Sequence, residues 1–191
     1  IGGVLKKFNS NAYCGKSDYF IAEVDESDGT FLKFNPNIVV LSNVDKDHLD
    51  YYKDFQAIKD AFISFCNKVA DNGVICLCLD DPINREICVN IKAKIITYGV
   101  DPNADIYAAD IQMDGIFSSF IPIINGKKLS RIKLPLPGKY NISNALASIA
   151  VASFLKLNME KFLFSLEKFS GVLHRFTVLG HVKNTTVVDD Y

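Results

Sequence analysis

The chain has 191 residues, of which 49% are hydrophobic and 12% aromatic, so it can bury a core of domain size. Its 21 basic and 22 acidic side chains leave a net charge of -1 without a basic block, which argues against nucleic acid as a partner. No apolar run approaches the roughly 18 to 20 residues of a membrane span, and residues 1–10 lack a signal-peptide pattern, so we expect a cytoplasmic protein without membrane insertion.

The first half of the sequence predicts alternating strands and helices. Residues 18–24 (DYFIAEV) and 37–43 (NIVVLSN) are short apolar runs bounded by turn formers, typical of buried parallel strands. Apolar residues at three- and four-residue steps predict a helix from Phe55 to Val69, with Gly73 as its C-terminal cap. A strand over 73–79, a short helix with Pro82 in its first turn and a strand over 93–99 follow. We expect an α/β fold, a Rossmann-like doubly wound and mainly parallel sheet flanked by helices.

From about residue 100 the pattern changes to three strand-like runs over 104–113, 116–124 and 128–136, separated by DG and NGKK turns. They predict a small antiparallel insert over about 100–136. A helix follows, with Asn141 as its N-cap and an apolar stripe from Ile142 to Phe154. A second helix around Met159–Phe169 precedes the segment GVLHRFTVLGHV and a final strand over 185–190.

The five cysteines do not indicate a disulfide framework, because their number is odd and most of them lie in apolar segments. We expect reduced, buried thiols at Cys66, Cys76, Cys78 and Cys88. Cys76 and Cys78 alternate along a strand, which is the wrong spacing for a zinc site.

Residues 22–52 surround one apolar strand with carboxylates and a histidine. Glu23 ends the first predicted strand, and His48 follows the second. Ligands of parallel sheets collect at the carboxyl ends of the strands, so the two side chains could complete the shell of a divalent cation that also holds phosphate oxygens and water. Asp25, Glu26 and Asp28 could equally well cap a helix that starts near Ser27.

A calcium loop in the same segment is excluded by spacing. Placing Gly29 at the sixth position of such a loop puts Val24 at the first, where an oxygen ligand is required.

The segments AEVDESDGTFL, NPNIVVLSNVDKDHLDYY, DDPINRE, PGKYNISNALA, GVLHRF and VVDDY resemble, in order and over nearly the whole chain, the motifs of the Mur ligase family. Within the family, ESDGTFL followed by DHLDYY resembles the branch that adds L-alanine to UDP-N-acetylmuramate. The resemblance implies an ATP-dependent, amide-forming ligase of peptidoglycan synthesis. ATP would phosphorylate the lactyl carboxylate of UDP-N-acetylmuramate, and the amine of L-alanine would attack the acyl phosphate.

The resemblance also assigns site residues. It implies that Glu23 and His48 bind Mg2+, that Asn144 contacts the adenine of ATP, and that Arg175 reaches the ATP phosphates. The residues by themselves leave alternatives open, since Arg175 could form a surface ion pair and Asn144 could belong to a polar helix face.

Three further assignments come from the same resemblance. Asp190 would bind the ribose, and Tyr191 lies where the amino-acid pocket begins. Tyr140 stands where the family usually has histidine; it can still stack on adenine but cannot become charged. His174 replaces a more usual arginine, which weakens the local positive potential near neutral pH. Arg85 stays unassigned.

The sequence contains no G-x-x-x-x-G-K-[ST] loop, although a Mur ligase needs such a loop to hold phosphates. We therefore expect residues 1–188 to be a central ATP-binding domain that lacks this loop, and residues 189–191 to begin the C-terminal domain. The N- and C-terminal domains of the ligase would be its partners. Two alternatives remain: a sibling ligase that adds another amino acid or a peptide, and a noncatalytic nucleotide-binding module.

Overall fold

The structure is a computed structural model that describes residues 2–183 and 185–190. Four strands lie side by side and parallel: β1 (Ile38–Leu41), β2 (Val74–Cys78), β3 (Ile95–Gly99) and β4 (Ile106–Asp114). Three antiparallel strands, β5 (Phe117–Ile124), β6 (Lys127–Lys128) and β7 (Ile132–Leu134), complete a seven-stranded sheet. The mainly parallel α/β fold and its antiparallel part are confirmed, and β4 joins the two parts into one sheet.

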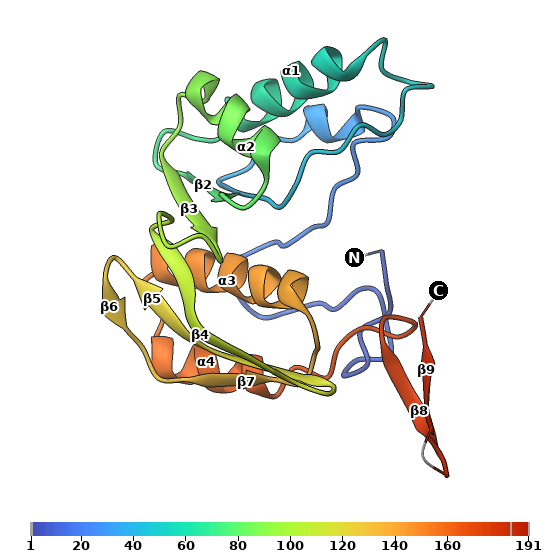
Figure 1. The fold of residues 1–191 in the computed structure, drawn as a ribbon. Helices are drawn as coiled ribbons and strands as arrows, with labels where there is room; N and C mark the ends of the chain where they lie inside the picture. Colours follow the sequence, from blue (N-terminus) through green and yellow to red (C-terminus); the bar gives the residue numbers. More distant parts are fainter. Residues whose placement is uncertain (1, 184, 191) are drawn as a thin grey trace.

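Helices cover both faces of this sheet (Figure 1). One face carries α1 (Phe55–Cys66), α2 (Pro82–Ile87) and the 3-10 turns η1 (Thr30–Lys33) and η2 (Cys88–Asn90). The other face carries α3 (Lys139–Phe154) and α4 (Met159–Glu167). Within the part of the chain that the structure describes, no helix is long and apolar enough to cross a bilayer.

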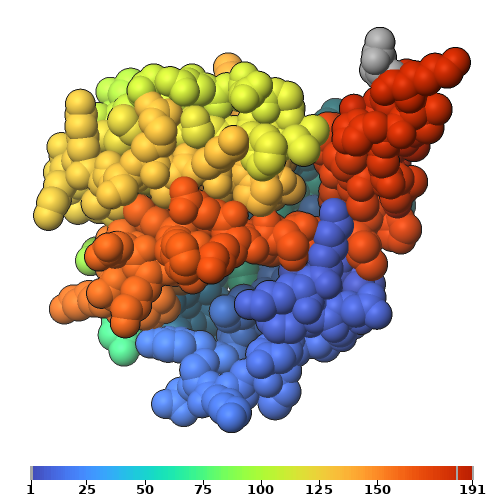
Figure 2. All heavy atoms as spheres, turned by 90° about the horizontal axis from the view of Figure 1, so that it is seen from below, coloured from blue at the N-terminus to red at the C-terminus, as the bar shows by residue number. Residues whose placement is uncertain are grey.

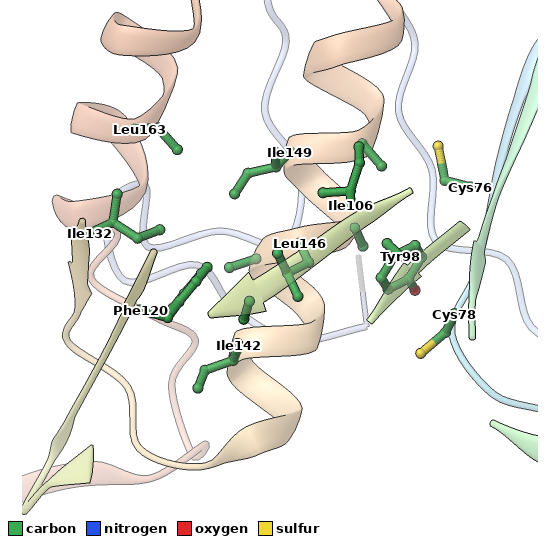
Figure 3. Packing of buried hydrophobic residues seen from close by; sticks show 14 of the residues in the cluster. Cys76, Cys78, Tyr98, Ile106, Phe120, Ile132, Ile142, Leu146, Ile149 and Leu163 are labelled. Atoms are coloured by element: carbon green, nitrogen blue, oxygen red, sulfur yellow. The ribbon is translucent and has the colours of Figure 1, made fainter. Parts of the chain in front are cut away.

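The continuous apolar sequence of β2 follows from burial on both of its faces. Val74, Cys76 and Cys78 point into the core under α3, whereas Ile75 and Leu77 point into the core under α1. Figure 3 shows the first of these cores, in which Ile142, Leu146 and Ile149 project from α3 toward the sheet, with Leu163 of α4 and Phe120 of β5 nearby. The predicted apolar stripe of α3 is therefore the contact between this helix and the sheet.

The predicted strand over residues 18–24 is wrong for this structure. The segment has no regular secondary structure, and Phe20 and Ile21 are 90% and 87% exposed. A strand forms only when a neighbour accepts its backbone hydrogen bonds, and β1 lies at the end of the sheet with β2 as its partner. An apolar pattern alone does not supply that neighbour.

Two predicted caps are also wrong. Helix α1 has its C-cap at Asn67, and Gly73 lies farther on, where a Cβ would meet the backbone oxygen of Asn37 at 2.2 Å. Helix α3 has its N-cap at Gly138, whose φ of 95° favours glycine, and the Asn141 side chain donates to the Pro137 carbonyl at 2.7 Å. Gly73 is needed because the Asn37 backbone packs against it, and Gly138 because its backbone conformation favours glycine.

The C-terminal strands β8 (Thr177–Val182) and β9 (Thr185–Asp189) form a separate antiparallel pair. In Figure 2 this pair stands out from the body of the molecule beside the N-terminal segment. Backbone hydrogen bonds join the chain just before β8 to that segment, from Lys6 N to Gly171 O at 3.1 Å and from Leu173 N to Val4 O at 2.8 Å. The two ends of the chain are thereby held together.

All five cysteines are free thiols, and their burial predicts their reactivity. Burial raises the pKa of Cys66 and of Cys76 to about 12, whereas Cys14 is exposed. At pH 8 a thiol with that pKa is ionised in only about one molecule in 10,000, and the thiolate is the nucleophile. We expect iodoacetamide to alkylate Cys14 in the folded chain and to reach Cys66 and Cys76 only after unfolding, as followed by peptide mass spectrometry. Equal alkylation rates at the three sites before unfolding would contradict the burial of Cys66 and Cys76.

Candidate functional site

The loops that leave the carboxyl ends of the parallel strands form one edge of the sheet, where ligands of such folds bind. The longest of them, residues 42–54, is called the His48 loop below. Its root is held by buried side chains: Asn84 Nδ2 donates to Ser42 O at 3.1 Å and to Cys78 O at 3.0 Å, and Tyr98 Oη donates to Leu41 O at 3.3 Å. Neither anchor is indicated by a local sequence pattern; the only general signal is that buried asparagine and tyrosine usually have hydrogen-bond partners.

The N-terminal turns of α3 reach the same edge. Ser143 Oγ lies 3.4 Å from Cys78 Sγ, at the last residue of β2. Tyr140 and Asn144 stand on these turns and are exposed. The positive end of a helix dipole favours anionic ligands, and an aromatic ring and an amide beside it are suited to a nucleotide base. The structure thus brings Tyr140 and Asn144 to the edge from which the His48 loop leaves.

His48 lies in a tightly determined part of its loop. Its φ is 54°, in the left-handed region, and its carbonyl accepts hydrogen bonds from Tyr51 N and Tyr52 N, each at 3.0 Å. Its own N–H donates to Asp47 Oδ1 at 2.8 Å. A non-glycine residue in the left-handed region has an unfavourable backbone conformation, and these local hydrogen bonds offset its cost.

The carboxylate nearest to the imidazole is that of Glu26, whose Oε1 lies 3.8 Å from His48 Nε2. Glu23 instead accepts a hydrogen bond from Gly2 N at 2.6 Å. Because residues 18–24 do not form a strand, the expected convergence of two neighbouring strand ends is not the route by which carboxylates approach His48. The segment around Glu26 reaches the histidine instead. From the sequence alone Glu26 could equally well be a helix-capping residue or a site residue.

Residues 25–29, called the acidic turn below, are shaped by their own carboxylates. Asp25 Oδ1 accepts from Ser27 N at 2.7 Å, and Asp28 Oδ1 accepts from Thr30 N at 2.9 Å. Hydrogen bonds from Ser27 hold the pKa of Asp25 below its usual range, and those from Thr30 do the same for the pKa of Asp28. Both bonds reach the residue two positions on, and the N-cap of η1 is Gly29 without a side-chain cap bond, so the expectation that Asp25 and Asp28 cap a helix near Ser27 is wrong.

The side chains at this edge include the types of ligand that a hard divalent cation takes. They are carboxylates together with one imidazole, and Mg2+ usually takes one or two protein carboxylates, with waters and substrate phosphates filling the rest of its octahedral shell. Among residues 2–183 and 185–190 no group of three or more His, Cys, Asp or Glu side chains could hold a metal ion alone. An ion here would therefore need ligands from the nucleotide or from water.

The remaining predicted site residues lie at the base of the β8–β9 pair. Asp190 Oδ1 accepts a hydrogen bond from Phe176 N at 3.3 Å, and His174 Nδ1 lies 2.7 Å from Asp189 Oδ2. Arg175 stands between His174 and Phe176 in the segment that enters β8. Tyr191 lies outside the described residues.

Comparison with known proteins shows similarity to Mur ligases. Residues 4–152 match the family model of the Mur ligase middle domain. Over the whole chain, 42% of residues are identical to the UDP-N-acetylmuramate--L-alanine ligase of Geotalea daltonii, and 44% to the enzyme of that name from Desulforapulum autotrophicum. The chain spans about 42% of the length of each of these relatives.

Solved structures agree on the fold. The UDP-N-acetylmuramate-alanine ligase MurC of Thermotoga maritima superimposes with a TM-score of 0.74 and 28% identity, covering 87% of this chain and 37% of that one. MurF of Acinetobacter baumannii gives a TM-score of 0.74 over 86% of this chain and 36% of its own, but at 23% identity it shows the fold alone. Because the middle-domain model matches more than half of the chain, this protein belongs to the Mur ligase family.

Proposed function

We propose that this chain is the greater part of the ATP-binding domain of a ligase that joins L-alanine to the lactyl carboxylate of UDP-N-acetylmuramate. The observation that carries the proposal is likeness along the entire chain to ligases named for that reaction. The geometry supports it, since Tyr140, Asn144 and His48 all belong to the segments at the carboxyl edge of the sheet.

The chemical difficulty of the reaction is charge, because an anionic carboxylate must approach an anionic triphosphate. Catalysis of phosphoryl transfer consists largely of positioning and of neutralising the transferred group. Bound Mg2+ would supply that neutralisation, held by Glu23 and His48 as the resemblance implies. The N-terminal end of α3 would add its positive dipole to the same edge.

The other residues receive nucleotide-binding roles in this proposal. Tyr140 would stack on the adenine and Asn144 would contact its edge. Arg175 would approach the phosphates and Asp190 the ribose, while Tyr191 would border the amino-acid pocket. Support for this pairing is that Asp190 accepts a hydrogen bond from the N–H of Phe176, the residue that follows Arg175.

We also propose that ligation requires parts of the complete protein beyond this chain. The sequence holds no phosphate-binding glycine loop, and the relatives are more than twice as long. In this proposal residues 1–188 belong to the central domain and residues 189–191 begin the next one. The cytoplasm would be the compartment, which suits five thiols without a disulfide.

The test is an assay of phosphate release by the complete protein with ATP, Mg2+ and UDP-N-acetylmuramate. We expect release to depend on L-alanine and to exceed that with L-serine, glycine or a tripeptide. Preference for another amino acid or for the tripeptide would assign the chain to a sibling ligase. ATP binding without phosphate release in any mixture would indicate a noncatalytic nucleotide-binding module. The isolated 191-residue chain should form no amide in the same assay.

A further inference from the structure

Two consecutive tyrosines of the His48 loop lie beside the acidic turn, and they differ in burial. Tyr52 is 7% exposed, whereas Tyr51 is 56% exposed. Their rings meet edge to face, with centroids 4.9 Å apart and an interplanar angle of 81°. The buried member of the pair makes the polar contacts described next.

Tyr52 touches both segments through hydrogen bonds. Its hydroxyl donates to the backbone carbonyl of Glu26 at 2.7 Å, and its backbone N–H donates to the carbonyl of His48 at 3.0 Å. Glu26 is also the residue whose carboxylate lies 3.8 Å from the His48 imidazole. Tyr52 therefore links two residues that are 22 positions apart in sequence, Glu26 through its hydroxyl and His48 through its backbone N–H.

Gly29 allows this close approach. Its φ is 69°, and a Cβ at this position would lie 2.5 Å from Tyr51 Oη. The positive φ favours glycine here, and a side chain would also require the exposed Tyr51 ring to move. Burial is the main cause that raises the pKa of Tyr52, so its hydroxyl keeps the proton that it donates.

We propose that Tyr52 is a positioning residue for the divalent ion: its hydroxyl holds the acidic turn against the His48 loop, so that the Glu26 carboxylate lies within reach of the ion that His48 binds. That an ion binds here at all rests on the proposed function. The physical reason is preorganisation, since ligands already held at the right separation lose less freedom when the ion binds. Loss of a partner that orients a metal ligand lowers metal affinity by roughly 10- to 100-fold. Loss of a single neutral hydrogen bond should lower it by about 10-fold or less.

The experiment compares Tyr52→Phe with Tyr51→Phe in the complete protein. The first change removes only the hydroxyl bonded to Glu26 O and keeps the buried ring, and the second is the same change at the exposed neighbour. Binding of Mn2+ in the presence of ATP is measured by electron paramagnetic resonance, which needs no turnover. The Mg2+ concentration that gives half-maximal phosphate release is measured in parallel, together with the thermal unfolding midpoint.

We expect Tyr52→Phe to weaken Mn2+ binding and to raise the half-maximal Mg2+ concentration by about 3- to 10-fold, with activity restored at high Mg2+. Tyr51→Phe should leave both values unchanged. The proposal is overturned if Tyr52→Phe lowers only the unfolding midpoint, or if the two variants shift ion binding equally. Absence of L-alanine-dependent phosphate release in the unmodified protein would contradict the proposed function, and the Mn2+ comparison would still decide the role of Tyr52.

Discussion

Replacing Glu23 by alanine in the complete protein is expected to reduce ATP-dependent phosphate release by about 100-fold or more at low Mg2+. The carboxylate would be an anionic ligand of the ion that shields the transferred phosphate, and alanine offers no oxygen in its place. Glu23 is exposed and its carboxylate is bonded to Gly2 N, so the substitution creates no cavity in the core. The measurement is the initial rate of phosphate release as a function of Mg2+.

Two matched variants make this result interpretable. Glu160→Ala removes a carboxylate from the first turn of α4, where no site residue is assigned, and should leave the rate unchanged. Glu26→Ala removes the carboxylate that lies nearest to His48 in the structure. A large loss with Glu26→Ala and full activity of Glu23→Ala at low Mg2+ would move the metal assignment from Glu23 to Glu26.

A second large effect is expected in the core. Phe120→Ala should lower the free energy of unfolding by about 3–5 kcal/mol, a large part of the roughly 5–15 kcal/mol that a domain possesses. Phe120 is 0% exposed in β5 and packs in the core beneath α3 (Figure 3). Removing its ring leaves a cavity that rigid neighbours fill only in part. The measurement is urea-induced unfolding of the 191-residue chain, followed by circular dichroism.

Phe164→Ala is the matched control for this variant. Phe164 lies on α4 but is 57% exposed, and its ring is covered by Lys168 Nζ at 4.0 Å from the ring centroid. The same truncation there should cost about 1 kcal/mol or less, because little apolar area leaves the interior. Equal losses in the two variants would show that the sheet face beneath α3 and α4 is not the main core.

Local patterns predicted those elements whose partners come from nearby sequence. The steps of Phe55, Ile58, Phe62 and Phe65 gave α1, and the apolar run VICLC gave β2. The caps at Gly73 and Asn141 were wrong because their roles depend on distant atoms, such as Asn37 O beside Gly73. The third antiparallel run became two short strands, since β6 and β7 pair with different parts of β5.

The candidate site likewise combines residues that sequence motifs predicted with contacts that only the folded chain makes. Motif likeness assigned Glu23, His48, Asn144 and Arg175 to a nucleotide and metal site, and these roles stay predictions. No sequence pattern indicated that Tyr52 bonds to Glu26 or that Asn84 holds the root of the His48 loop. Such contacts join residues 26 and 42 positions apart, and nothing in the local sequence of either partner specifies the other.

The sequence by itself determined the α/β class, the alternation of strands and helices, and membership of the Mur ligase family, because each of these depends on residue order along the chain. Only the tertiary structure decided that residues 18–24 remain outside the sheet and that Glu26, held by Tyr52, lies beside His48. The physical reason is that a strand or a metal-ligand pair exists only when a second segment arrives at hydrogen-bonding distance. That arrival is fixed by the packing of the whole domain rather than by either segment alone.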